Sequence, residues 1–96
     1  MKSYNPLEKE IEKKVCEYAK SKGVLCYKFT SPNQRSVPDR IFHFKGHTWY
    51  IEFKRLGQEP TAAQSIEIAR IRAQGISVTV VDNVEHGKAI VDLEAR

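Results

Sequence analysis

The chain has 96 residues, 41% of them hydrophobic and 29% charged, and sixteen Lys and Arg against twelve Asp and Glu give a formal net charge of +4. This length predicts one domain over residues 1–96 with a modest core, and the composition excludes an intrinsically disordered chain. No apolar run approaches the ~18 residues of a membrane span, and the charged N-terminal segment is not expected to be a secretory signal. The mild positive charge fits a polyanionic partner but does not require one.

The first element predicted is a helix. Asn5 is a good N-cap and Pro6 suits a first helical turn. Apolar residues then recur at helical spacing, at Leu7, Ile11, Val15, Tyr18 and Ala19. Gly23 ends this helix, and residues 24–29 are predicted to form the first strand.

Residues 30–37 form a loop rich in Ser, Pro, Asn and Gln. Residues 39–44 and 48–54 are predicted to be strands. The short turn at 45–47 between them indicates a hairpin.

A second helix is predicted over 62–74, with Thr61 as its cap and Gly75 as its terminator. A strand over 76–81 and a short final helix capped by Asp82 or Asn83 follow. The order α-β-β-β-α-β-α predicts a mixed central sheet flanked by helices, of the α/β class. The crossover through the second helix predicts a last strand parallel to the third.

The two cysteines, Cys16 and Cys26, do not have the spacing of a zinc site. One falls in a predicted helix and the other in a predicted strand. We therefore expect two reduced, buried thiols in a cytoplasmic protein, with a disulfide as the lesser alternative.

Side chains alternate along a strand, so the strand at 48–54 has two different faces. One face is apolar, with Trp49, Ile51 and Phe53, and the other carries Tyr50, Glu52 and Lys54. The hairpin can bring Asp39, at the start of the neighbouring strand, close to Glu52. Two neighbouring carboxylates repel one another unless a cation lies between them, and Mg²⁺ prefers such oxygen ligands.

A lysine beside this pair could stabilise charge on a phosphate or position a water molecule. Each feature has an ordinary structural explanation when it is taken alone. A Glu-X-Lys sequence is commonly a solvated ion pair on a strand, and Pro-Asp is a common turn. Their order and spacing on adjacent strands favour a metal-dependent active site built around Asp39, Glu52 and Lys54.

The sequence Val37-Pro38-Asp39 followed by Ile51-Glu52-Phe53-Lys54 resembles the PD-(D/E)XK nuclease superfamily, whose core is α-β-β-β-α-β. Within it, the chain most resembles the VRR-NUC (virus-type replication-repair nuclease) group, over roughly residues 7–82. The resemblance implies a restriction-endonuclease-like fold. It also rests on a glutamate in the first helix and on Gln64 at the opening of the second.

The resemblance implies a set of site residues. The implied catalytic residues are Glu8, Asp39, Glu52, Lys54 and Gln64, and the implied metal ligands are Asp39, Glu52, Phe53 and Glu8. Glu8 fits the helix-one position best, Glu12 is the main alternative, and Glu10 and Glu17 also compete for it. Gln64 would orient Lys54 or a phosphate, the alternative being an ordinary exposed helix residue.

The predicted DNA-binding residues are Arg35, Ser36, Arg40 and Arg55, which lie near the proposed site. Arg40 departs from the family pattern, which often has an apolar residue there, and is expected to face solvent or a phosphate.

The resemblance further implies a Mg²⁺-dependent endodeoxyribonuclease, with Mn²⁺ as a substitute. Its expected substrate is branched DNA, a four-way (Holliday) junction cut by a homodimer, in a phage- or bacterium-encoded cytoplasmic protein. The alternatives are a nuclease of the same fold acting on flaps, nicked or single-stranded DNA, and a catalytically inactive DNA-binding module.

Overall fold

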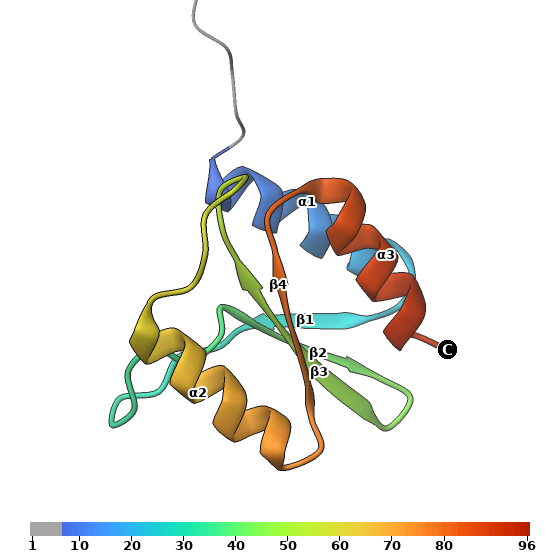
Figure 1. Cartoon of the computed structure of the whole chain (residues 1–96). Helices are drawn as coiled ribbons and strands as arrows, with labels where there is room; N and C mark the ends of the chain where they lie inside the picture. Colours follow the sequence, from blue (N-terminus) through green and yellow to red (C-terminus); the bar gives the residue numbers. More distant parts are fainter. Residues whose placement is uncertain (1–6) are drawn as a thin grey trace, which may run out of the picture.

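A computed structural model of the chain describes residues 7–96, and its elements follow the predicted order (Figure 1). The helices are α1 (Glu8–Ser21), α2 (Ala62–Ala73) and α3 (Val84–Glu94). The strands are β1 (Leu25–Lys28), β2 (Arg40–Phe44), β3 (His47–Phe53) and β4 (Ser77–Val81).

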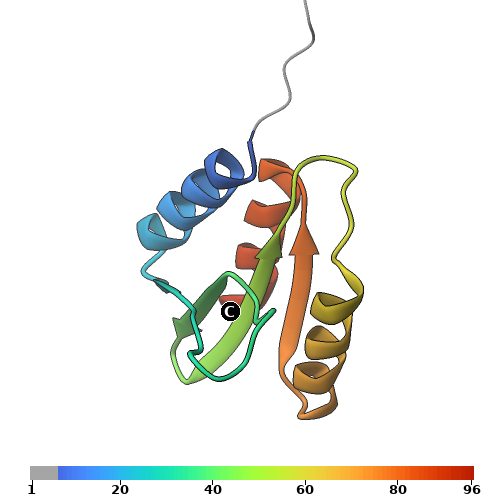
Figure 2. The same cartoon turned by 90° about the vertical axis from the view of Figure 1, so that its left-hand side faces the viewer.

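The strands form one mixed sheet in the order β1-β2-β3-β4. The pairs β1–β2 and β2–β3 are antiparallel, whereas β3 and β4 are parallel. The parallel pair confirms the prediction made from the crossover through α2. Helices α1 and α3 lie on one side of the sheet and α2 on the other (Figure 2).

The core fills the space between the sheet and the α1–α3 pair. The predicted apolar face of β3 is fully buried there, with Trp49, Ile51 and Phe53 all 0% exposed. Phe42 of β2 stacks on Trp49 with their ring centroids 5.5 Å apart. Cys16 and Cys26 are free and buried in the same cluster, as expected of two thiols.

The described strands and α2 begin and end within one residue of the predicted positions, and the start of α1 and the β2–β3 turn are the two boundaries considered next. Leu7 is the N-cap of α1, and its N–H donates to the carboxylate of Glu10 at 3.2 Å; the expected start at Asn5 and Pro6 lies outside the described residues. The β2–β3 turn has two residues rather than three, because Lys45 (φ 47°) and Gly46 (φ 84°) both adopt the positive φ of a type I′ turn. His47 therefore belongs to β3 and pairs with Phe44.

The other predicted caps are present. Thr61 accepts a hydrogen bond from Gln64 N–H at the start of α2, and Asn83 accepts one from His86 N–H at the start of α3. Along residues 7–96, no helix has both the length and the apolar character needed to cross a bilayer.

Candidate active site

The register of the β2–β3 hairpin brings the two predicted carboxylates together. Arg40 pairs with Ile51, so the next position along the ladder sets Asp39 opposite Glu52. One oxygen of Asp39 accepts a hydrogen bond from Phe53 N–H at 2.7 Å. The main chain of Asp39 is held as well, because its carbonyl accepts from Phe29 N–H at 2.9 Å and closes the intervening loop.

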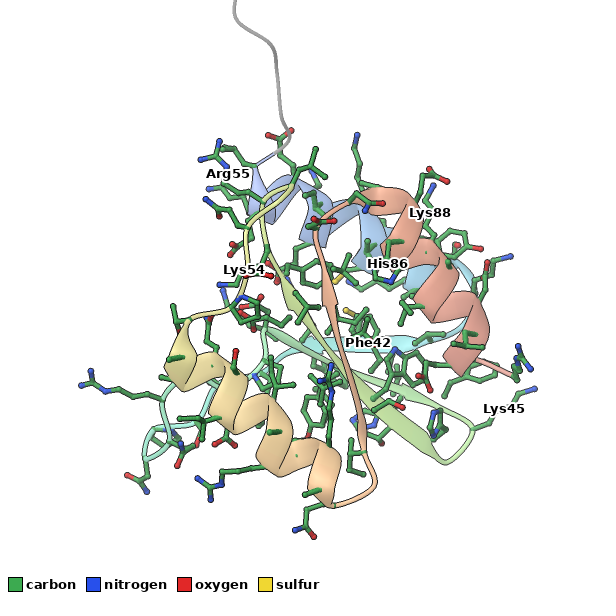
Figure 3. All side chains as sticks on the ribbon, in the orientation of Figure 1. Phe42, Lys45, Lys54, Arg55, His86 and Lys88 are labelled. Carbon is green, nitrogen blue, oxygen red and sulfur yellow. The ribbon has the colours of Figure 1, made fainter. Side chains whose placement is uncertain are left out.

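Glu52 is a buried acid, only 2% exposed. Its burial and the neighbouring charge of Asp39 raise its pKa from 4.5 to about 7, although Lys54 acts in the opposite direction. The Lys54 ammonium lies 3.5 Å from a Glu52 carboxylate oxygen. Lys54 follows the end of β3 on the side of α2 (Figure 3). One lysine therefore stands beside two closely spaced acids.

The pKa of Asp39 is also raised. Desolvation by burial is the main cause, the Phe53 N–H opposes it, and the charges of Glu12 and Glu8 add to it. The site thus holds a concentration of negative charge that its own hydrogen bonds do not fully compensate. This is the electrostatic setting in which a divalent cation binds favourably.

Two glutamates of α1, Glu8 and Glu12, differ in what they interact with. Glu12 forms an ion pair with Arg40, with 2.5 Å between the carboxylate oxygen and the guanidinium nitrogen. Glu8 is the glutamate of α1 whose charge raises the pKa of both Asp39 and Glu52. Glu12 nevertheless acts more strongly than Glu8 on the pKa of Asp39, so the assignment of Glu8 rather than Glu12 to the helix-one position stays a prediction.

The donor set suits a hard cation that keeps much of its own hydration. Within residues 7–96, no three His, Cys, Asp or Glu side chains are gathered closely enough to hold a metal ion. In this arrangement Glu8 adds negative charge near the two acids, and its role as a third ligand stays a prediction. Mg²⁺ commonly uses one or two carboxylates and completes its shell with water and substrate phosphate, which Asp39 and Glu52 can satisfy. The Phe53 side chain has no oxygen ligand, so only the main-chain carbonyl of this residue is suited to Mg²⁺.

Gln64 has a structural partner. Its side-chain oxygen accepts a hydrogen bond from Thr61 N–H at 2.9 Å, while its own N–H donates to the Thr61 hydroxyl at 3.1 Å. This reciprocal capping box follows from the Thr-X-X-Gln spacing, a signal already present in the sequence. A role for Gln64 in orienting Lys54 stays a prediction.

The predicted DNA-binding residues lie in different environments. Arg35 and Arg55 are exposed, and Arg55 points away from the sheet just beyond Lys54 (Figure 3). Ser36 adopts a φ of 66° in the loop before Asp39, a conformation that is uncommon outside glycine. The Arg40 side chain, expected to face solvent or a phosphate, is instead 26% exposed and paired with Glu12. Nothing in the local sequence pattern predicts this pair.

No family model matches the chain. The chain is 39% identical over 77 residues to "Putative nuclease p44" of Acyrthosiphon pisum secondary endosymbiont phage 1, a match that covers 79% of this chain and 83% of that protein. A solved structure described as a VRR_NUC domain superimposes with a TM-score of 0.81 at 24% identity, covering 88% of this chain and 94% of that one. This likeness confirms the predicted restriction-endonuclease-like α/β fold. The chain therefore belongs to the family of the phage protein p44 and has the fold of a VRR-NUC domain.

Proposed function

We propose that this protein is a metal-dependent endonuclease that hydrolyses phosphodiester bonds in DNA. The observation that carries the proposal is the opposed pair of Asp39 and Glu52, with the Lys54 ammonium 3.5 Å from Glu52. The name of the phage relative, a nuclease, supports the same class of reaction.

Asp39 and Glu52 would hold Mg²⁺ or Mn²⁺, with the Phe53 carbonyl and Glu8 as further ligands. When bound, the cation would supply Lewis acidity, which would polarise the scissile phosphate and make the attacking water more acidic. Lys54 stabilises the charge that develops on the phosphate oxygens as water attacks phosphorus and the P–O bond breaks. The hydrogen bond from Phe53 N–H to Asp39 fixes the direction of that carboxylate before substrate arrives.

The active-site assignment is tested by substitution. Asp39→Asn and Glu52→Gln should each reduce Mg²⁺-dependent cleavage by ~10²-fold or more, because each removes a charge from the cation site. Lys54→Met should lower the cleavage rate by ~10²–10³-fold through lost charge stabilisation. Single-turnover cleavage of a labelled four-way junction, with Mg²⁺, Mn²⁺ or EDTA, measures these rates.

Glu94→Gln is the matched control. Glu94 is a carboxylate that contacts His47, at the opposite end of β3 from Glu52, so its loss should leave cleavage within about 2-fold of wild type. Wild-type cleavage by Asp39→Asn, or undiminished cleavage in EDTA, would sink the assignment.

We further propose that the substrate is a four-way junction and that the enzyme acts as a homodimer in the bacterial cytoplasm. A twofold protein matches the symmetry of a junction in which two strands are cut. Leu25 and Tyr27 leave apolar surface for a second copy on β1, since they are 53% and 54% exposed. The same assay should give paired symmetric nicks on the junction, whereas preferential cutting of a flap, nicked duplex or single strand would replace this substrate.

A further inference from the structure

A basic groove runs along the flank of α1, next to the candidate active site. It has a volume of about 380 Å³ and lies between α1 and the adjoining ends of β1 and β2. Its cationic lining residues are Lys9, Lys13, Lys20, Lys28 and Arg40. Neither the proposed chemistry nor the predicted DNA contacts use the four lysines.

The groove has a surplus of positive charge. Its two carboxylates are Glu12 and Glu17, and Glu12 is already paired with Arg40. Within residues 7–96, none of the four lysines of the groove forms an ion pair within 4.0 Å. These ammonium groups are therefore available to a polyanion.

The spacing of the lysines along the groove suits a chain of phosphates rather than one small anion. Lys9, Lys13 and Lys20 lie on one flank of α1 and extend over ~16 Å of its axis. One strand of B-DNA presents about five phosphates over that length. A groove that repeats its positive charge along its length matches a repeating anionic backbone.

The groove also leads to the catalytic acids. Lys9 follows Glu8 in the chain, and Arg40 follows Asp39. Glu12 connects the two regions, since its carboxylate pairs with Arg40 and its charge raises the pKa of Asp39. A DNA strand held in the groove would therefore lie next to the proposed site.

We propose that this groove binds the sugar–phosphate backbone of the DNA next to the scissile bond. The inference rests on the proposed nuclease function for its substrate class. It assigns to Lys9, Lys13, Lys20 and Lys28 a positioning role that depends on charge and not on DNA sequence.

Adjacent lysines on α1 allow a closely matched experiment. Lys13 lines the groove, whereas its neighbour Lys14 is exposed and does not. Lys13→Ala and Lys14→Ala therefore remove the same charge from the same helix. Binding of a labelled four-way junction and of linear duplex is measured by anisotropy in EDTA over a range of KCl concentrations, with thermal melts to verify folding.

Each groove contact should contribute ~0.9 to the slope of log K against log salt concentration. Lys13→Ala should reduce the slope by about that amount, Lys13→Ala/Lys20→Ala by ~1.8, and Lys14→Ala should leave it at the wild-type value. Equal slopes for the Lys13 and Lys14 variants would overturn the groove assignment.

The same samples distinguish a failure of the groove assignment from a failure of the proposed nuclease function. Wild-type cleavage in Mg²⁺ together with unchanged slopes in the groove variants would refute the groove and leave the nuclease intact. Groove-dependent binding without any wild-type cleavage would refute the nuclease and support the groove. A wild type that binds no DNA would overturn both.

Discussion

A single buried side chain, Glu52, titrates well above the usual range of a glutamate. Its pKa is raised from 4.5 to about 7 by burial and by the charge of Asp39. Between these two values the folded protein holds a proton that the unfolded chain has released. The stability that Glu52 contributes is therefore fully present below about pH 4.5 and is lost as the pH rises to about 7.

Replacing Glu52 with a residue that does not titrate should weaken the pH dependence of the free energy of unfolding. In EDTA, the free energy of unfolding should fall between pH 5 and pH 8 in both proteins. The fall should be smaller in Glu52→Gln than in wild type, by about 1–3 kcal/mol. Urea unfolding at both pH values measures the difference, and Glu94→Gln should keep the wild-type dependence. Parallel pH profiles for wild type and Glu52→Gln would show that the pKa of Glu52 is not raised.

At the level of elements, the packing of α1 against α3 depends on one glycine. A Cβ added at Gly87 would meet Val15 Cγ2 at 2.3 Å, a distance so short that the Val15 side chain or the two helices would have to shift. Glycine within a helix ordinarily costs ~1 kcal/mol relative to alanine. Close approach of the helices explains why α3 has glycine at this position.

Gly87→Ala should therefore destabilise the fold, by ~1–3 kcal/mol, in spite of the better helix propensity of alanine. The exposed Ala89 of the same helix is the control, where Ala89→Gly should cost ~1 kcal/mol from propensity alone. Denaturant unfolding of both variants measures the two effects. A Gly87→Ala variant more stable than wild type would contradict the close helix contact.

The element order was predictable from sequence because local rules determine most of it. Alternation along β3 assigned Trp49 and Glu52 to opposite faces, and the short turn brought Asp39 to Glu52. The Glu12–Arg40 pair could not be predicted in this way, because it joins a helix to a strand 28 residues away. Gln64 is the opposite case. The local Thr-X-X-Gln spacing predicts its capping role, whereas the family resemblance implies a role in the active site.

At the scale of the whole molecule, the site and the core share the same strand. Ile51 and Phe53 are fully buried on either side of Glu52, so unfolding that exposes the core also disperses the carboxylate pair. A cation that binds only the folded site must therefore stabilise the entire domain. Protons compete for the same carboxylates, so this coupling depends on pH.

Mg²⁺ should accordingly raise the melting temperature at pH 8 more than at pH 5, where Glu52 is protonated. A binding contribution of ~1 kcal/mol corresponds to a rise of ~4–8 °C in a domain of this size. Thermal melts with Mg²⁺, compared with NaCl at equal ionic strength, isolate the specific effect. Glu52→Gln should remove most of the rise and Glu94→Gln should retain it. The opposed carboxylates are the feature that makes this site selective for a divalent ion. An equal rise in melting temperature for wild type and Glu52→Gln would therefore show that the cation binds elsewhere.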